Sequence, residues 1–575
     1  MKLIAKYLKP YYGRMFFGLL IKIFGTVAEL FMPWILAHIL DDVVPQAKLD
    51  GNMRPMIFWG VMMFFMVVIA RTCNVIANRK AAEVSKNTIY SLRNDLFEQI
   101  LHLSGKQTDR IGIPSLISRM TTDTYNIHHA INMMQRMGVR APMIIIGGLF
   151  LTATLEPVLT LVLAGTLPFV VLVVVVVSKK GIPLYAKVQQ AIDVMVRTVR
   201  EDVAGIRVIK ALSKNEYEKN RFGKANDAVV KEELKASGVM AMSGPLLNLC
   251  LNLGLTFVII VGAFRVNAGI SKAGKIVAFL TYFTLILNAV IAVNRIFVMM
   301  SKAIASAARI DDVFEAENDL KVEESIGFSS ENRLEFRNVS FSYQGDMDKL
   351  CLENVNFTLR KGQNLGIIGA TGSGKTTLFH LLMRFYDVTE GEILVDGKNI
   401  KSYPLQELRK RFGVAFQNDV VFHDTVQENI SFGRDLTTEE INEAAKWANA
   451  YDFIMEKEGG MEHVAAIKGA DFSGGQKQRL LVARALAGGP EFLLLDDASS
   501  ALDYKTDAFI RKQIRENLKH TMTITIAQRI SSVMQADLIL VLDDGVVIGQ
   551  GTHEELLETC ETYREIYHSQ MGTEL

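Results

Sequence analysis

The chain has 575 residues, of which 49% are hydrophobic and 22% are charged. Its 63 Lys and Arg residues nearly balance its 62 Asp and Glu residues, and a formal net charge of +1 gives no reason to expect a nucleic acid partner. Cys73, Cys250, Cys351 and Cys560 lie far apart and match no metal-ligand spacing, so no disulfide framework is expected. The length predicts several domains.

The first 305 residues hold the long apolar stretches of the chain. A helix that spans a bilayer needs about 20 mostly apolar residues. Six stretches meet this length, at about residues 15–40, 55–78, 135–153, 157–178, 242–264 and 275–300. The first is too long for the core of a signal peptide and lacks a small-residue cleavage site, so we interpret it as a retained helix. The pattern predicts an all-α transmembrane domain of six helices over residues 1–305.

Two long polar segments, 79–134 and 179–241, separate these stretches and carry many lysines and arginines. Positively charged segments stay in the cytoplasm. Six spans then leave both termini in the cytoplasm, and the outer connections lie near 41–54, 154–157 and 265–274. Arg265, Lys272 and Lys275 beside the third outer connection go against the rule, but the basic residues of the long segments outnumber them. We therefore expect a multi-pass protein of the cell membrane.

Two charges interrupt the first span. Lys22 and Glu29 are seven residues apart, or two helical turns, so they share one face. A charge within a membrane marks a functional position by default, and we predict Glu29 as a substrate contact. The alternative is that this helix extends beyond the bilayer and Lys22 reaches its surface. Methionines crowd residues 53–66 and 133–143. They suit an apolar or amphipathic cargo, with ordinary packing as the alternative.

Beyond an expected linker at 306–330, residues 331–575 alternate short strands with helices. The strand NLGIIG runs directly into GATGSGKT, residues 369–376, and a helix follows. In a P-loop of this form, backbone N–H groups and the helix N-terminus bind phosphate. We expect Lys375 to reach the outer phosphates of ATP and the Thr376 hydroxyl to ligate Mg²⁺. The predicted ATP-binding residues of this loop are Gly369, Ala370, Thr371, Gly372, Ser373, Gly374, Lys375, Thr376 and Thr377.

Two further segments carry the groups that such a loop requires. The apolar strand EFLLLD ends in Asp496, which we expect to hold Mg²⁺, and Asp497 stands where a base could orient the attacking water. The alternative is that Asp497 only caps the next turn. Ser473, Gly474, Gly475 and Gln476 open another helix, whose N-terminus offers N–H groups and a hydroxyl to an anion.

These motifs together resemble an ABC transporter half over essentially the whole chain. The resemblance rests on GATGSGKT, FSGGQ at 472–476, LLLDD at 493–497 and the SALD turn at 500–503. It implies an exporter-type domain of six membrane helices followed by an α/β P-loop nucleotide-binding domain. The segments 115–124 and 202–218 resemble the cytoplasmic loops that dock on such domains.

In this family two nucleotide-binding domains pair head-to-tail, and each ATP lies between the P-loop of one chain and the SGGQ segment of the other. The resemblance implies that Tyr343 stacks on adenine and that Gln417 contacts Mg²⁺ or the attacking water. It also implies that Ser473 and Gly475 contact the γ-phosphate of the nucleotide held by the partner. Asp503 of the SALD turn joins the nucleotide contacts on the same ground.

Two positions depart from the family pattern. Asp497 stands where glutamate is usual, and Gln528 stands where histidine is usual. Aspartate is one methylene shorter, and a misplacement of about 1 Å can cost on the order of 10²-fold in rate. Glutamine can donate a hydrogen bond but cannot shuttle a proton. Ile467 also replaces an acidic residue that many exporters carry before SGGQ, so coupling is expected to differ there.

The combined change resembles the degenerate-site subunit of a heterodimeric ABC exporter. We therefore predict an ATP-binding and permease subunit that pairs with a different chain and uses ATP and Mg²⁺ to move an apolar or amphipathic compound, such as a drug, lipid or peptide. Three alternatives stay open at this point. They are an importer built on the exporter fold, a homodimeric exporter with slow sites, and an ATP-gated regulatory membrane protein.

Overall fold

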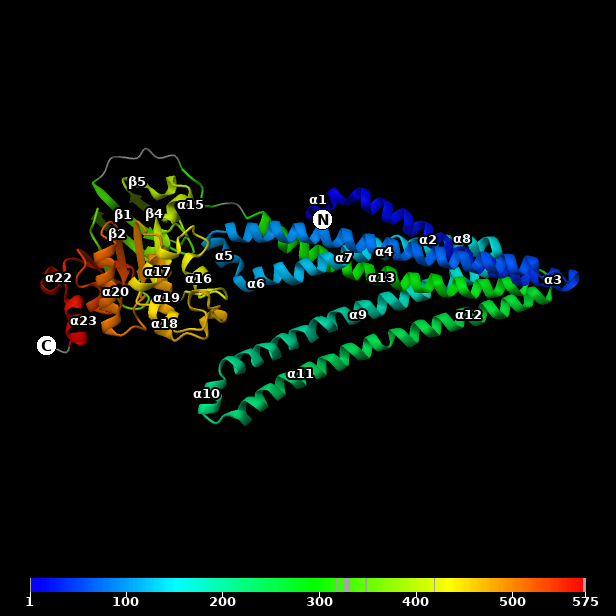
Figure 1. Ribbon diagram of the computed structural model, residues 1–575. Coiled ribbons are helices and arrows are strands. Elements are labelled where there is room, and N and C mark those ends of the chain that lie inside the picture. Colours follow the sequence, from blue (N-terminus) through cyan, green and yellow to red (C-terminus); the bar gives the residue numbers. More distant parts are fainter. Residues whose placement is uncertain (1, 317–318, 324–330, 347–348, 418, 572–575) are drawn as a thin grey trace. The chain divides into compact units, whose positions relative to one another are not determined.

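A computed structural model gives the fold of residues 2–316, 319–323, 331–346, 349–417 and 419–571. Internal contacts divide the chain into two compact units. The helical unit comprises Met1–His102 and Ile113–Glu315, and the nucleotide unit comprises Leu103–Gly112 and Ala316–Leu575. The predicted order, an all-α domain followed by an α/β domain, is confirmed (Figure 1).

The helical unit is built from long helices that lie side by side (Figure 1). Six helical stretches are long and apolar enough to cross a membrane, and each contains one of the six predicted spans. The helices are α1 (Lys2–Leu8), α2 (Tyr12–His38), α3 (Val44–Asp50), α4 (Arg54–His102), α6 (Ile113–Ser118), α7 (Thr124–Met137), α8 (Arg140–Leu155), α9 (Pro157–Ala204), α10 (Ile206–Ala211), α11 (Asn215–Ala241), α12 (Ser243–Asn267) and α13 (Ala273–Phe314). Short π-type or 3₁₀ turns at Lys9–Tyr11, Ile39–Val43 and Arg119–Asp123 join some of them.

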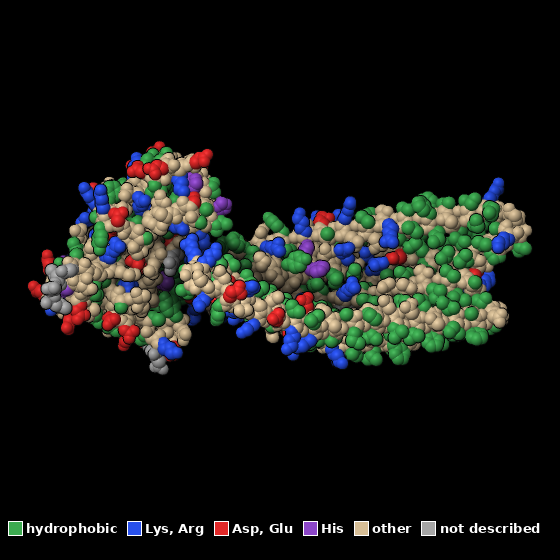
Figure 2. Space-filling model, turned by 90° about the horizontal axis from the view of Figure 1, so that it is seen from below, with side chains coloured by type: hydrophobic (Ala, Val, Ile, Leu, Met, Phe, Trp, Pro, Cys, Tyr) green, Lys and Arg blue, Asp and Glu red, His purple; other side chains and the backbone are tan. Residues whose placement is uncertain are grey.

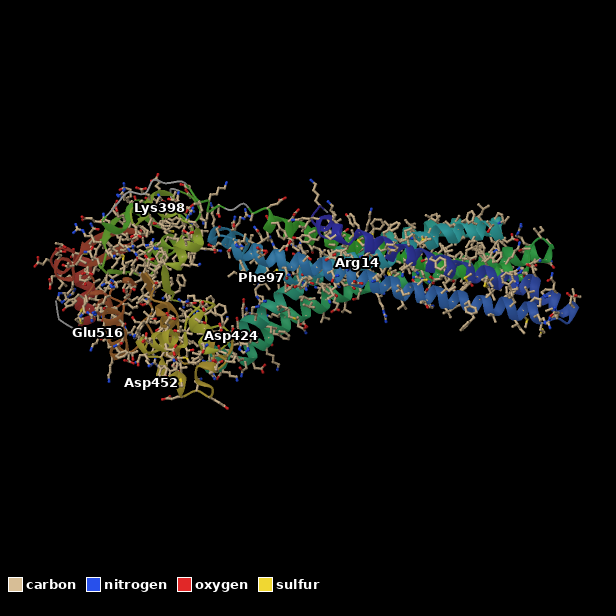
Figure 3. All side chains as sticks on the ribbon, turned by 45° about the horizontal axis from the view of Figure 1, so that its top comes forward. Arg14, Phe97, Lys398, Asp424, Asp452 and Glu516 are labelled. Atoms are coloured by element: carbon tan, nitrogen blue, oxygen red, sulfur yellow. The ribbon has the colours of Figure 1, made fainter. Side chains whose placement is uncertain are left out.

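Several of these helices are longer than a bilayer is thick. Helix α4 has 49 residues, so at 1.5 Å per residue it extends about 74 Å, against about 30 Å of hydrocarbon. The excess length explains the predicted polar segments: they continue the membrane helices. On the helical unit, hydrophobic side chains gather along one part of the surface, and lysines and arginines lie along the rest (Figure 2). At the charged end of α2, Arg14 (Figure 3) pairs with Glu83 of α4 at 3.3 Å.

The last helix continues into the predicted linker. Helix α13 runs to Phe314, so the first nine residues of the range 306–330 are helical. Buried polar contacts hold this end: Ser306 Oγ donates to Asp123 Oδ1 at 2.8 Å, and Arg309 Nε donates to Asp123 Oδ2 at 2.9 Å. Asp123 is 1% exposed, so its charge is compensated within the helical unit. Residues 317–318 and 324–330 of the predicted linker lie outside the described residues.

The nucleotide unit holds two sheets. One has six strands in the order β10-β9-β3-β8-β7-β6, and the other has four in the order β2-β1-β4-β5. The strands are β1 (Asn332–Phe341), β2 (Leu352–Arg360), β3 (Leu365–Gly369), β4 (Glu390–Val395), β5 (Lys398–Asn399), β6 (Phe412–Ala415), β7 (Phe492–Asp496), β8 (Met522–Ile526), β9 (Leu538–Asp543) and β10 (Val546–Gly551). Its helices are α5 (Gly105–Ile111), α14 (Lys375–Leu382), α15 (Leu405–Lys410), α16 (Val426–Ser431), α17 (Thr438–Trp447), α18 (Tyr451–Met455), α19 (Gly474–Leu486), α20 (Tyr504–Asn517), α21 (Ile530–Val533), α22 (His553–Thr559) and α23 (Glu561–Met571).

The six-stranded sheet determines where the site lies. Strands β3, β8, β7 and β6 are parallel, and β7 is buried along its whole length, as a continuous apolar run in a central parallel strand predicts. Parallel strands end at one edge of a sheet, and ligands bind beyond the carboxyl ends of such strands. Gly369, Asp496 and Ile526 therefore lie at the same edge.

One short helix from the N-terminal half packs within the nucleotide unit. Ser104, which precedes α5, donates through its Oγ to Asp319 Oδ2 at 3.1 Å. Asp109, which lies within α5, accepts a hydrogen bond from the Tyr386 hydroxyl. Segment Leu103–Gly112 belongs to the nucleotide unit, whereas segments 115–124 and 202–218 belong to the helical unit. The docking of 115–124 and 202–218 on the nucleotide-binding domain stays a prediction.

Arg384 offers a test of the packing of the nucleotide unit. Its guanidinium is fully buried, pairs with Asp387 at 2.8 Å, and donates to the carbonyl oxygens of Lys401 and Lys321 at 3.0 and 2.6 Å. Because Arg384→Met leaves Asp387 and the carbonyl oxygen of Lys321 without this donor, we expect a loss of about 3 kcal/mol in unfolding free energy. Denaturation followed by Trp447 fluorescence measures it, since the other two tryptophans lie in the helical unit.

A matched control for Arg384 is Lys512→Ala. Lys512 pairs with Glu516 at 3.8 Å, and both side chains are exposed. An exposed pair of this kind contributes about 0.5 kcal/mol or less. An Arg384→Met variant as stable as the Lys512→Ala variant would contradict the assignment of Arg384 as a structural anchor.

Candidate active site

The loop between β3 and α14 forms one wall of the site. Gly372 and Gly374 adopt φ values of 90° and 94°, a region that side chains with a Cβ rarely enter, so these two positions require glycine. Lys375 Nζ donates to the carbonyl oxygens of Gly369 and Ala370 at 3.0 and 2.6 Å. Burial lowers the pKa of Lys375, although nearby carboxylates oppose the shift. The loop thus presents backbone N–H groups and one cation together, as a phosphate site requires.

Asp496 lies opposite this loop, at the end of β7. Its Oδ2 accepts a hydrogen bond from Thr376 Oγ1 at 2.9 Å. Two neighbouring ligands of an octahedral Mg²⁺ at 2.1 Å are about 3 Å apart, so these two oxygens fit one Mg²⁺. Among the described residues no group of three or more His, Cys, Asp or Glu side chains is arranged to hold a metal ion.

Asp497 contacts two amide side chains from distant parts of the chain. Its Oδ2 accepts from Gln528 Nε2 at 2.9 Å and from Gln417 Nε2 at 3.4 Å. The Asp497 backbone has a φ of 50°, and the side chain is almost buried. Burial raises the pKa of Asp497 and, separately, that of Asp496. The carboxylate thus bonds across the site, which the alternative of a simple turn cap does not explain.

A cavity of about 430 Å³ joins these groups. Its volume lies within the range of small-molecule sites. Of the residues predicted from the sequence, those that line it are Tyr343, Thr371, Gly372, Gly374, Lys375, Thr376, Thr377, Gln417, Asp496, Asp497 and Gln528. The structure therefore gathers most of the predicted P-loop, metal and base positions around one space.

Tyr343 stands at the far wall of this cavity. Its hydroxyl lies 3.1 Å from Thr377 Oγ1 and 3.2 Å from His380 Nδ1. The Tyr386 ring meets the Tyr343 ring edge-on, with centroids 5.1 Å apart, and burial raises the pKa of Tyr343. Tyr386 lies 43 positions after Tyr343 in the sequence and packs against it. No sequence motif indicated this contact. The stacking of Tyr343 on adenine stays a prediction.

The SGGQ segment lies at the start of α19. Ser473 Oγ accepts from the backbone N–H of Gln476 at 3.3 Å, and Gln476 Oε1 accepts from the backbone N–H of Ser473 at 2.9 Å. This reciprocal capping orders the helix N-terminus. Ser473 and Gly474 are exposed, and none of residues 473–476 lines the 430 Å³ cavity. Within one chain, the P-loop therefore lines the 430 Å³ cavity, whereas the SGGQ segment lies outside it.

Comparison with known proteins agrees with this geometry. Residues 15–290 match the family model of the ABC transporter transmembrane region, and residues 352–500 match that of the ABC transporter. YfiB of Bacillus subtilis (strain 168), an uncharacterized ABC transporter ATP-binding protein, is 34% identical over 575 residues, with 100% of this chain and 99% of that protein covered. The chain belongs to the ABC transporter family.

Other similar proteins show how far the likeness extends. A Staphylococcus aureus (strain NCTC 8325 / PS 47) protein, provisionally named as a multidrug export ATP-binding/permease protein, is 31% identical over 578 residues, with 99% of each chain covered. A bacterial Atm1-family ABC exporter, solved with ATP bound, has the same fold, with a TM-score of 0.81, 24% identity and 98% of each chain covered. This ABC transporter thus has the exporter-type fold.

The turn after Asp497 is hydrogen-bonded to α19, the helix of the ABC transporter that begins at the SGGQ segment. Gln478 of α19 donates to Ser500 Oγ at 2.7 Å and accepts from the backbone N–H of Ala501 at 2.8 Å. Asp503 caps α20 by accepting from the backbone N–H of Thr506 at 2.8 Å. The structure therefore places Asp503 at a helix cap outside the cavity, and its nucleotide contact stays a prediction. The sequence motifs did not indicate a role for Gln478, although this residue lies two positions after the SGGQ segment.

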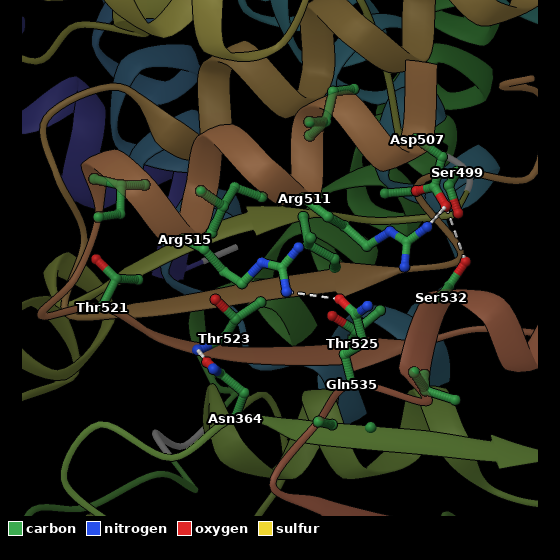
Figure 4. Close-up of a pocket in the computed structure, with 18 of the residues that line it drawn as sticks. Asn364, Ser499, Asp507, Arg511, Arg515, Thr521, Thr523, Thr525, Ser532 and Gln535 are labelled. Carbon is green, nitrogen blue, oxygen red and sulfur yellow. Dashed lines mark hydrogen bonds and ion pairs between the residues drawn. The ribbon is translucent and has the colours of Figure 1, made fainter. Parts of the chain in front are cut away.

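A second cavity, of about 380 Å³, lies beneath α20 (Figure 4). Asp507 pairs with Arg511 at 3.0 Å and accepts from Ser532 at 3.1 Å, and Arg515 donates to Gln535 at 2.6 Å. Arg511 Nε is buried and has no hydrogen-bond partner among the described residues. The P-loop and the strand-end carboxylates line the other cavity instead. None of the predicted nucleotide-binding residues lines this cavity, whereas most of them line the 430 Å³ cavity.

Proposed function

We propose that this chain is the degenerate-site subunit of a heterodimeric ABC exporter. Its own P-loop site would bind Mg-ATP and hydrolyse it poorly. Its SGGQ segment would complete a second, competent site on a different half-transporter. Together the two chains would move an apolar or amphipathic compound across the cell membrane.

The contact between Asp497 and Gln528 carries this proposal. A base that orients the attacking water must reach beyond the strand end, and the short Asp497 side chain bonds to Gln528 and Gln417 instead. Gln528 donates an amide hydrogen bond to that carboxylate, and a neutral amide cannot shuttle a proton. By comparison, Lys375 and Thr376 line the same cavity, which supports the proposed binding of Mg-ATP. Bound Mg²⁺ would neutralise charge on the phosphates, held through Thr376 and Asp496.

The position of SGGQ supports a partner chain. Ser473 caps an exposed helix N-terminus outside the chain's own cavity, so its free N–H groups and hydroxyl are available to a nucleotide held by another subunit. An intact motif of this kind is consistent with a composite site that hydrolyses ATP.

Isolation of the native complex tests the proposal. The chain, tagged at its C-terminus, is purified from membranes of its own host in mild detergent, and the subunits that accompany it are sequenced. We expect one different half-transporter with glutamate after the metal aspartate and histidine after the next strand. Recovery of the chain only with further copies of itself would contradict the heterodimer.

We also predict the orientation of the spans. Both long polar segments carry many cations, so the termini and the nucleotide-binding domain should be cytoplasmic. Single cysteines in a cysteine-free background, probed with an impermeant maleimide on intact cells, measure this. Labelling is expected at Gly51→Cys and Gly269→Cys, which lie in outer connections, and not at Gly205→Cys. Labelling of the Gly205→Cys variant from outside would overturn the orientation.

A further inference from the structure

Arg140, the first residue of α8, holds Glu29 of α2 in a two-pronged ion pair. Arg140 Nη2 lies 2.8 Å from Glu29 Oε1 and 3.0 Å from Oε2, and Arg140 Nε lies 3.2 Å from Oε2. Bidentate pairs of this geometry are the strong form of a salt bridge. The negative charge of Glu29, predicted from the sequence as a substrate contact, is therefore compensated within the chain.

Lys22 adds a buried positive charge to this region. It is 4% exposed, and its Nζ donates to the Oδ1 atoms of Asn74 and Asn78 on α4 at 2.7 and 3.0 Å. Amide oxygens accept these hydrogen bonds but carry no net charge. Arg136 of α7 lies close enough to act on Lys22 electrostatically and, within the described part of the chain, forms no ion pair. Three cations and one carboxylate leave two positive charges in excess.

The sequence supplies no other carboxylate at this level of the membrane domain. Glu29 is the only Asp or Glu within residues 15–40, 55–82, 130–155 and 276–310, which include the membrane parts of α2, α4, α8 and α13. A charge within a membrane is costly unless a partner compensates it. We define Lys22, Glu29, Arg136 and Arg140 as the cationic cluster.

The ends of α2 and α13 give the depth of the cationic cluster. Asp41 accepts hydrogen bonds from the backbone N–H groups of Gly274 and Lys275 at 2.6 and 2.8 Å, so these helices meet at one end of the span. Glu29 and Lys22 precede Asp41 by 12 and 19 residues, or about 18 and 28 Å of helix. In a hydrocarbon layer of about 30 Å, and with the proposed orientation, the cluster lies in the inner half.

Arg140 also lines a cavity of about 180 Å³ between α7, α8 and α13. Asn288 is the other long polar side chain on its wall, and Ala141, Ile144, Leu285 and Ala289 supply apolar surface. Cavities for whole drug-sized ligands start at about 300 Å³. This one therefore suits one acidic group together with the apolar atoms next to it.

We propose that the cationic cluster and this cavity form a cargo subsite for an amphipathic anion, that is, a molecule with a phosphate or carboxylate group on an apolar body. The inference rests on the proposed function, because it names the cargo class of that transporter. Arg140 would donate to the acidic group, and Glu29 would orient the guanidinium without contacting the cargo. Lys22 and Arg136 would add attraction for an anion and repulsion for a cation.

Binding in the absence of nucleotide tests the subsite. The purified full chain is placed in nanodiscs of phosphatidylcholine alone, which excludes anionic lipid headgroups as the bound species. Decyl phosphate, decyltrimethylammonium and inorganic phosphate are titrated below micelle-forming concentrations, and heat of binding is measured against empty nanodiscs. We expect saturable binding of decyl phosphate and much weaker binding of the other two probes.

Charge-neutralising variants assign the binding to the cluster. Arg140→Gln should weaken decyl phosphate binding about 10-fold or more, because a hydrogen bond to a charged group is lost. The double variant Glu29→Gln/Arg140→Gln removes both charges and should show the same loss of binding. This result would show that the loss comes from the missing Arg140 donor and not from a Glu29 carboxylate left without its partner. Glu29→Gln alone should tighten decyl phosphate binding, because it removes the competing anion.

Arg71→Gln is the matched control. Arg71 is an exposed cation of α4 and lies 17 residues from the start of that helix, about 26 Å along it. It should leave decyl phosphate binding unchanged. Three results would overturn the subsite: equal losses in Arg71→Gln and Arg140→Gln, binding of inorganic phosphate as tight as that of decyl phosphate, or binding of decyltrimethylammonium that depends on Glu29.

A separate readout concerns the transporter as a whole. Decyl phosphate should stimulate ATP hydrolysis by the complex isolated with its partner. If decyl phosphate binds with the expected variant pattern but leaves hydrolysis unchanged, the subsite stands and the proposed transport function fails. If hydrolysis responds to other compounds while decyl phosphate does not bind, the subsite fails and the transport function stands.

Discussion

Ser473→Arg should reduce steady-state ATP hydrolysis by the isolated complex about 100-fold or more. Ser473 caps α19, and its hydroxyl and the neighbouring N–H groups lie exposed outside the chain's own cavity. In the proposed head-to-tail pair they would face the nucleotide of the partner, where prepositioned donors would stabilise the developing phosphate charge. Arginine removes the hydroxyl and adds a long side chain where the γ-phosphate would lie. Coupled-enzyme measurement of phosphate release checks the result.

Asp497→Asn is the contrasting change in the same chain. Asp497 belongs to the site built by the chain's own P-loop, where its carboxylate already bonds to Gln528. Under the proposed function this site hydrolyses ATP poorly, so loss of that charge should change hydrolysis by the complex by no more than about two-fold. If Asp497→Asn proves as damaging as Ser473→Arg, Asp497 is a working base and the degenerate-site proposal fails.

The paired substitution Asp497→Glu/Gln528→His should create a working site in the chain alone. Glutamate restores the missing methylene, and histidine restores a group that can carry a proton, so hydrolysis should rise about 100-fold. The two side chains are in contact at 2.9 Å, and contacting residues show non-additive effects. Each single substitution should therefore recover only a small part of the gain. Full recovery by Asp497→Glu alone would assign the whole defect to side-chain length.

Much of the site was predictable because its determinants are local. The P-loop requires glycines at fixed positions between a strand and a helix, and the strand that ends in Asp496 is a continuous apolar run. Length and apolar content likewise predicted the six membrane helices. The Mg²⁺ role predicted for both Thr376 and Asp496 also implied that these side chains would meet, and the parallel strands bring them to one edge of the sheet.

Contacts between distant residues were not predictable in the same way. Glu29 and Arg140 are 111 residues apart. The sequence of the helix that carries Glu29 does not indicate which charged residue of another helix will face Glu29. Asp497 and Gln528 were both singled out, but their mutual hydrogen bond depends on the register of β7 and β8. The helix after Ser104 had a readable signal, a Ser-x-x-Gln capping box at 104–107, which marks the break that separates Leu103–Gly112 from α4.

The most direct test of the degenerate site is ATP turnover by the purified chain without its partner. In lipid nanodiscs with saturating Mg-ATP, every site that this chain can form contains Asp497 and Gln528. We expect stoichiometric binding of a fluorescent ATP analogue, because Lys375 and Thr376 are in place, together with steady-state hydrolysis about 100-fold below that of the isolated complex. Hydrolysis by the chain alone at the rate of the complex would contradict the account.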